Sequence, residues 1–157
     1  MGGNTRILIV DDDENIRKVL TAIFEDEGYT VESVDTAKKA IERTRRKFYN
    51  IVLIDIRLPD MEGIELLTKM RDTIPKMRKI IITGYPTLQN AIEAVNRGSD
   101  AYILKPFNME KVLETMKEQL KEQEEEKRYS QEKVAEFIET RVRELNMKKE
   151  VTQKRNP

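Results

Sequence analysis

The sequence predicts an α/β protein with a doubly wound parallel sheet, followed by a charged helical extension. Two observations predict the sheet. Over residues 1–120, short apolar runs rich in β-branched residues alternate with segments of helical spacing. The runs at 7–10, 51–54 and 80–82 are continuously apolar, as expected of parallel strands covered on both faces. A third observation predicts the extension, because 19 of the 37 residues in 121–157 are charged, against 37% of the whole chain.

Five strands are predicted, and a stripe of mostly apolar residues at helical spacing follows each of them. The strands cover 6–10, 29–34, 51–54, 79–83 and 101–104. The stripes, in chain order, consist of Ile16, Val19, Leu20, Ile23 and Phe24; Ala37, Ala40, Ile41 and Thr44; Ile64, Leu67, Met70 and Arg71; Leu88, Ala91, Ile92 and Val95; and Met109, Val112, Leu113, Met116 and Leu120. Gly28 and Gly98 are predicted to end the first and fourth helices, and Thr73 and Pro75 the third.

The order of these elements also predicts where function lies. Regular alternation with short loops implies parallel strands joined by right-handed crossovers. In such a sheet the functional site lies outside the carboxyl ends of the strands. We therefore expect the residues that follow the strands to carry the chemistry.

Composition excludes several classes of function. Lys plus Arg and Asp plus Glu both total 29, and a protein that binds nucleic acid through bulk charge should instead be basic. The chain has no Cys and no His, which excludes disulfides, thiolate nucleophiles, the usual zinc ligands and a Ser-His triad. The longest apolar runs span four residues, too few for a membrane span or a signal peptide. We expect a soluble, cytoplasmic protein whose chemistry rests on carboxylates, Lys, Thr, Tyr and backbone groups.

Acidic residues follow the first and third predicted strands. Asp11 and Asp12 follow the first, and Asp55 follows the third. In the acidic run 11–14, the later residues have a simpler interpretation as helix caps. Three converging carboxylates would repel one another and raise their pKa values unless a cation bound there. Oxygen ligands favour a hard ion, and Mg²⁺ is the better candidate because so few protein ligands leave positions for water and a phosphate.

The fourth and fifth strands end in residues that suit a phosphate. Thr83 and Lys105 could each be an ordinary turn residue, and Asp55 alone could be a loop cap. Together they are better explained as a phosphate site. A carboxylate can accept a phosphoryl group, Mg²⁺ and an ammonium group can neutralise its oxygens, and a Thr hydroxyl can donate to the product phosphate.

Four segments of this sequence together resemble the receiver domain of two-component response regulators. They are 7–13 (ILIVDDD), 55–63 (DIRLPDMEG), 82–84 (ITG) and 102–107 (YILKPF). Their order and spacing match the family over residues 5–120. The resemblance implies a flavodoxin-like five-stranded sheet of order 2-1-3-4-5 and a receiver domain over 1–120.

The resemblance also implies roles for individual residues. Asp55 would accept a phosphoryl group from a sensor histidine kinase or a small phosphodonor. Asp12, Asp55 and the backbone carbonyl of Arg57 would ligate Mg²⁺ directly, and Asp11 would act largely through water. Lys105 would contact the phosphate, and Thr83 would rotate its hydroxyl onto the new phosphoryl group.

Three further roles concern switching and dephosphorylation. Tyr102 would move inward as Thr83 moves, reshaping the surface formed by the fourth helix, fifth strand and fifth helix. Arg57 and Tyr85 occupy the positions that tune dephosphorylation in the family. Because both are bulky, we expect hindered access of water and a long-lived phosphorylated form.

The extension carries an apolar stripe of its own. Val134, Ile138, Val142 and Leu145 recur at steps of four, four and three. Either a single helix over 108–147 or a break at Tyr129-Ser130 would fit the sequence. We expect 121–157 to be a linker to an output domain or a helix for dimerisation or partner binding. No helix-turn-helix module follows residue 120, which disfavours direct regulation of DNA.

Competing interpretations fit the residues less well. A phosphatase of the haloacid dehalogenase type needs a second Asp where Arg57 stands, and a flavodoxin-type protein needs a phosphate-cradling first loop rather than an acidic one. A phosphorylation-independent receiver-like interaction module remains the alternative, although such proteins typically lose residues that are present here. We expect a signalling switch rather than a metabolic enzyme. Its expected partners are a sensor histidine kinase and a downstream effector or output domain, and a homodimer is a further option. We expect no direct binding to nucleic acid or to membranes.

Overall fold

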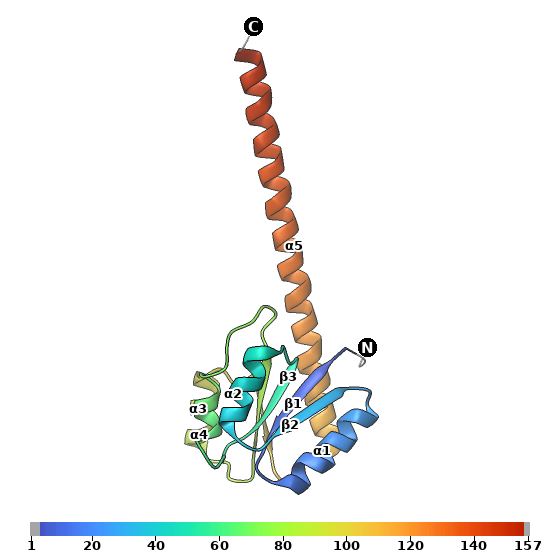
Figure 1. The fold of residues 1–157 in the computed structure, drawn as a ribbon, viewed down its shortest axis with the longest axis vertical. Helices are drawn as coiled ribbons and strands as arrows, with labels where there is room; N and C mark the ends of the chain where they lie inside the picture. The colour runs from blue at the N-terminus through green and yellow to red at the C-terminus, as the bar shows by residue number, and fades with distance from the viewer. Residues whose placement is uncertain (1–3, 156–157) are drawn as a thin grey trace. The chain divides into compact units, whose positions relative to one another are not determined.

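The computed structural model describes residues 4–155, with side chains as far as residue 152. Five parallel strands form one sheet of order β2-β1-β3-β4-β5, as predicted (Figure 1). The strands are β1 (Arg6–Val10), β2 (Thr30–Val34), β3 (Ile51–Asp55), β4 (Arg78–Thr83) and β5 (Ala101–Leu104). The order reverses direction between β1 and β3, and in such sheets ligands bind in a crevice outside the carboxyl ends of the strands at this switch point.

Five helices alternate with the strands. They are α1 (Glu14–Asp26), α2 (Ala37–Arg46), α3 (Gly63–Leu66), α4 (Leu88–Asn96) and α5 (Met109–Arg155). Asp13 caps α1, because its side chain accepts hydrogen bonds from the backbone N–H groups of Asn15 and Ile16. Gly28 and Gly98 follow α1 and α4 with φ of 91° and 97°, a left-handed backbone that glycine adopts without steric cost.

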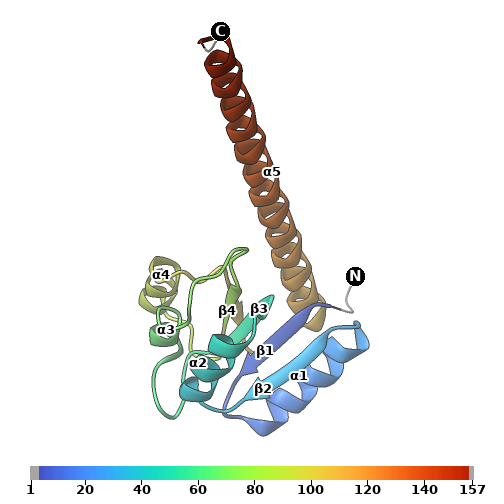
Figure 2. The same cartoon turned by 45° about the horizontal axis from the view of Figure 1, so that its top comes forward.

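Two hydrophobic cores lie on opposite faces of the sheet. Successive residues of a strand point to opposite faces, so Leu8 and Val10 of β1 lie in the first core and Ile7 and Ile9 in the second. The first core includes residues of α2, α3 and α4, and the second includes residues of α1 and α5. The turned view shows the same division of the helices between the two faces of the sheet (Figure 2). Both faces of the central strands are therefore covered, which explains their continuously apolar sequence.

The third helix is shorter than its apolar spacing predicts. The stripe from Ile64 to Arg71 indicated a helix ended by Thr73 and Pro75, whereas α3 ends at Leu66 and turns follow. The buried ammonium group of Lys79 donates a hydrogen bond of 2.7 Å to the carbonyl of Leu67, next to the helix end. Leu67 and Met70 are still buried in the core. The apolar spacing therefore predicted their burial correctly, but the helical backbone that it predicted for them is wrong.

The last helix is continuous. Of the two options for the extension, the structure has the unbroken one, because α5 passes through Tyr129 and Ser130 without interruption. None of the helices within residues 4–155 is both long and apolar enough to span a membrane.

The chain divides into two compact units, Met1–Gln123 and Glu124–Pro157. The first unit extends three residues past the predicted boundary after Leu120. Gln123 is buried and its side chain bonds to Asn50 and to the carbonyl of Lys76, which joins this turn of α5 to the first unit. The roles predicted for 1–120 and 121–157 stay predictions, and residues 1–3 and 156–157 lie outside the described residues.

Candidate functional site

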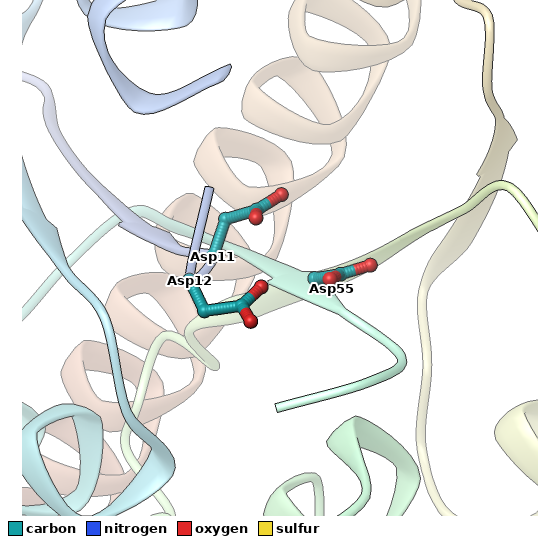
Figure 3. Close-up of side chains that lie close together, drawn as sticks. All are labelled: Asp11, Asp12 and Asp55. Atoms are coloured by element: carbon teal, nitrogen blue, oxygen red, sulfur yellow. The ribbon is translucent and has the colours of Figure 1, made fainter. Parts of the chain in front are cut away.

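Three carboxylates converge at the carboxyl edge of the sheet. Asp11 and Asp12 follow β1, and Asp55 is the last residue of β3, the neighbouring strand (Figure 3). One carboxylate oxygen from each lies within 4.8 Å of the others. Asp11 is buried, Asp55 is half-buried and Asp12 is exposed, so the group opens to solvent on one side. The predicted convergence of these three residues is therefore present.

Asp11 is held on all sides. Its backbone N–H donates to the carbonyl of Val34, and one carboxylate oxygen accepts from the backbone N–H of Asp13 at 2.9 Å. Its other carboxylate oxygen lies 3.2 Å from the ammonium group of Lys105. The carbonyl oxygen of Asp11 accepts a hydrogen bond of 2.7 Å from the guanidinium of Arg17. The loop after β1 is thus fixed by contacts with β2, α1 and the loop after β5.

Lys105, in the loop after β5, supplies positive charge beside two of the three carboxylates. Its ammonium group lies 3.4 Å from a carboxylate oxygen of Asp55 as well as close to Asp11. Its backbone N–H donates to the carbonyl of Thr83, which holds the loop after β5 against the end of β4. Burial alone would lower the pKa of Lys105, but the two carboxylates outweigh that effect and raise it, so the side chain is a cation at neutral pH.

The electrostatic balance leaves Asp55 unusually basic. Burial raises the pKa of the Asp55 carboxyl group from 3.8 to about 6, and the negative charges of Asp11 and Asp12 add to the rise. Lys105 opposes the rise without cancelling it. Excess negative charge therefore remains in this crevice, in the direction that the sequence predicted.

These residues fit a hard divalent cation. All of the side-chain donors are carboxylate oxygens, the donor type that Mg²⁺ and Ca²⁺ prefer. Burial first, and then the negative charges of Asp11 and Asp12, disfavour the ionised form of Asp55, and a bound divalent cation would offset both effects. Of the three, Asp12 and Asp55 are the ones whose oxygens have fewer protein hydrogen bonds, whereas both oxygens of Asp11 already accept one.

Thr83 and Tyr102 lie on the strands next to the carboxylates. Thr83 ends β4 and is buried, and its hydroxyl oxygen accepts a hydrogen bond of 3.0 Å from the backbone N–H of Tyr85. Tyr102 lies on β5 and packs against the core on the α2–α4 side. Within the described residues its hydroxyl group is buried without a hydrogen-bond partner. Neither side chain contacts the carboxylates directly in the contacts observed for the described residues.

The two residues predicted to tune dephosphorylation contact each other. The guanidinium carbon of Arg57 lies 4.0 Å from the centre of the Tyr85 ring, a cation–π arrangement. Arg57 comes two residues after Asp55 in the loop after β3, and Tyr85 comes two residues after Thr83 in the loop after β4. The stack therefore joins the loop that follows Asp55 to the loop that follows Thr83.

Three residues position the site although the sequence did not predict this role for them. Arg17 bonds to the backbone of Asp11, as described above. Asp60 accepts hydrogen bonds of 2.9 Å from the backbone N–H groups of Ala37 and Lys38, and so joins the loop after β3 to the start of α2. Gly63 leaves no room for a side chain, because a Cβ atom there would overlap the carbonyl oxygen of Asp55. Asp60 and Gly63 lie within the segment that carries the family resemblance, which was the available signal.

Comparison with known proteins gives a consistent result. The family model described as the response regulator receiver domain matches residues 7–117. Among curated proteins, the chain is 34% identical to the transcriptional regulatory protein ZraR of Klebsiella oxytoca over 119 residues, which is 76% of this chain and 27% of that protein. It is 34% identical to the regulatory protein AtoC of Escherichia coli K12 over 107 residues, 68% of this chain and 23% of that protein. The chain thus spans about a quarter of these relatives.

Solved structures agree with the sequence relatives. A CheY-like receiver domain protein from Methanospirillum hungatei JF-1 shares 49% identity, with a TM-score of 0.74 over 78% of this chain and 98% of that one. The beryllofluoride-activated NtrC4 receiver domain dimer shares 31% identity, with a TM-score of 0.71 over 75% of this chain and 98% of that one. The chain therefore belongs to the receiver domain family of two-component response regulators.

Proposed function

We propose that this chain is a phosphorylation switch in which Asp55 accepts a phosphoryl group from a sensor histidine kinase. One observation carries the proposal: the half-buried Asp55 carboxylate lies 3.4 Å from the Lys105 ammonium group, and one of its oxygens lies within 4.8 Å of an oxygen of Asp11 and of Asp12. A carboxylate in this setting can act as the nucleophile toward phosphorus. The bond to the donor nitrogen would break as the bond to the Asp55 oxygen forms.

Each neighbouring residue has a part in this transfer. Asp12, Asp55 and the backbone carbonyl of Arg57 would hold Mg²⁺ directly, with Asp11 acting largely through water. When bound, Mg²⁺ supplies positive charge that neutralises the oxygens of the phosphoryl group. Lys105 is already placed against Asp55 and would contact one of those oxygens. The chain would thus catalyse only its own phosphorylation and dephosphorylation.

The response to phosphorylation would begin at Thr83. Its hydroxyl oxygen is occupied by the N–H of Tyr85, which leaves the hydroxyl hydrogen available for a phosphoryl oxygen. Tyr102 would move inward in step with Thr83, from a position in which its hydroxyl group is already enclosed but unpaired. The nearby outer surface carries exposed apolar side chains that a partner could read, namely Leu88, Ile92, Val95 and Leu104.

The direct test is labelling by a small phosphodonor. We expect acetyl phosphate and Mg²⁺ to add one acid-labile phosphoryl group per chain, detected by mass spectrometry of the intact protein. Asp55→Asn should abolish labelling. Asp26→Asn is the matched control, because Asp26 is an exposed aspartate at the end of α1, outside the acidic crevice. Labelling of the Asp55→Asn variant at full stoichiometry would contradict the assignment, and absence of labelling in the wild type would favour a phosphorylation-independent interaction module.

The partners follow from the same proposal. A sensor histidine kinase would be the donor, and the reader would be a downstream effector or an output domain. We propose that residues 121–157 form a linking or pairing helix. Its support is the exposed apolar stripe of Val134, Ile138, Val142 and Leu145.

A further inference from the structure

Arg17 contacts the backbone of the acidic crevice, not its carboxylates. It lies in the first turns of α1, four residues after the cap residue Asp13. Its guanidinium donates a hydrogen bond of 2.7 Å to the backbone carbonyl of Asp11, rather than pairing with a carboxylate of the cluster. A charge-assisted hydrogen bond of this length is among the stronger contacts that a side chain can make to backbone.

This bond completes the fixation of Asp11. The backbone N–H and both carboxylate oxygens of Asp11 already have partners. The carbonyl oxygen is the acceptor that remains, and the peptide group that contains it also carries the N–H of Asp12. The orientation of this peptide sets the direction from which the Asp12 side chain leaves the backbone. Arg17 therefore acts on the exposed carboxylate, Asp12, through the backbone that precedes it.

We propose that Arg17 is a positioning residue that holds the Asp11–Asp12 peptide so that Asp12 is pre-oriented to ligate a divalent cation. The inference rests on the proposed function, because it assumes that the acidic crevice binds Mg²⁺. It concerns a residue that makes no contact with the ion itself. Outer contacts that orient ligands commonly decide metal affinity as much as the ligands do.

Charge and geometry make opposite predictions for this residue. The positive charge of Arg17 repels a cation, so its removal should leave Mg²⁺ affinity unchanged or raise it if charge alone matters. Loss of the hydrogen bond should instead lower the affinity, because Asp12 would have to be ordered at the moment of binding. The sign of the change therefore separates the two explanations.

The experiment measures Mg²⁺ affinity of the full 157-residue chain by isothermal titration calorimetry with magnesium chloride. We expect Arg17→Met to weaken binding about ten-fold, the usual size of an outer-contact effect. Arg17→Lys should recover part of the loss, because an ammonium group can donate one bond to the same carbonyl. Lys18→Met is the matched control, since Lys18 is the next residue, is exposed and pairs with Glu14. It removes the same charge and should leave the affinity within about two-fold of wild type.

A second measurement separates positioning from a general loss of structure. The rate of labelling by acetyl phosphate should fall for Arg17→Met at low Mg²⁺ and recover to the wild-type rate when Mg²⁺ is saturating. Thermal melting in EDTA reports whether each variant is folded. If Arg17→Met does not fold, Arg17→Gln, which keeps a polar side chain without the charge or the reach, carries the same expectation.

The outcomes are distinguishable. Wild-type affinity in Arg17→Met or Arg17→Gln, or tighter binding, would overturn the positioning role. An Arg17→Lys variant as weak as Arg17→Met would also overturn it. If wild type binds no Mg²⁺, or if Asp12→Asn binds as well as wild type, the proposed metal site itself fails, and the inference fails with it.

Discussion

The Asp55 carboxyl group couples folding stability to pH. Its pKa in the folded protein is raised from 3.8 to about 6, first by burial and then by Asp11. The folded state thus binds this proton more tightly than the unfolded state does. The stabilisation from the protonated group is complete below pH 3.8 and is lost as the pH rises through about 6.

Asp55→Asn should therefore stabilise the protein when no divalent cation is present. Above pH 7 in EDTA, the neutral amide avoids a buried charge, and the gain should be on the order of 3 kcal/mol. The gain should shrink toward zero near pH 4 because wild-type Asp55 is then protonated. Urea unfolding of both proteins across this range measures it. A stability difference that does not change with pH would contradict a raised pKa of Asp55 in the folded protein.

Gly63 is required by the close approach of the loop after β3 to the end of β3 itself. A methyl group there would overlap the carbonyl oxygen of Asp55 and lie 2.9 Å from Ile54 Cγ2. Gly63→Ala should destabilise the protein by about 2 kcal/mol, because backbone must move to admit it. Gly84→Ala is the control, since its Cβ would meet only Lys105 Cβ at 3.7 Å and Cδ at 3.9 Å, ordinary contacts. Equal urea midpoints for the two variants would contradict this steric explanation.

The stack of Arg57 on Tyr85 should slow the loss of the phosphoryl group. If it hinders water, Tyr85→Ala should shorten the half-life of the phosphorylated form about two- to five-fold, the factor that corresponds to an exposed cation–π contact. Tyr85→Phe keeps the aromatic ring and should behave like wild type. Phosphate release after removal of the donor provides the measurement. A wild-type half-life of a few seconds would count against hindered hydrolysis.

Gln123 fixes the turn of α5 at which the first compact unit ends. Its amide nitrogen donates to the carbonyls of Asn50 at 2.9 Å and Lys76 at 2.8 Å, and its amide oxygen accepts from the Asn50 side chain at 3.0 Å. Gln123→Ala should cost about 2 kcal/mol, because it leaves buried polar groups without these partners. Gln131→Ala, an exposed position of the same helix, should change stability little. Similar unfolding midpoints for both variants would show that the buried bonds contribute nothing.

The full chain should self-associate weakly through its extension. Ile138 and Val142 are exposed by 55% and 49% and lie four residues apart on one side of α5, an arrangement that pairing with another helix would bury. Light scattering at increasing concentration should show a mass that rises above 18.4 kDa. Ile138→Asp should suppress the rise, whereas Thr140→Asp, an exposed position on another side of the helix, should not. A strictly monomeric wild type would exclude self-pairing and favour a linker or a different partner.

The strands and the acidic crevice could be predicted from sequence because they depend on local patterns and one topological rule. Apolar runs such as 51–54 identify strands, and parallel strands bring their carboxyl ends to one edge. These two rules are enough to place Asp11, Asp12 and Asp55 together. The same local patterns misjudged α3, because the spacing of Leu67 and Met70 records burial, which a turn can also provide.

Contacts between residues far apart in the chain required the folded protein. The caps that Asp60 provides to Ala37 and Lys38 join residues 23 and 22 positions apart, and Gln123 meets Asn50 across 73 positions. The bond from Arg17 to Asp11 spans six residues, but it depends on a side-chain rotamer that no periodicity encodes. The alternation of apolar strand runs with segments of helical spacing thus determined the architecture and the place of the acidic crevice. Packing decided which polar groups orient the site, because only close packing brings specific donors within hydrogen-bond distance of specific acceptors.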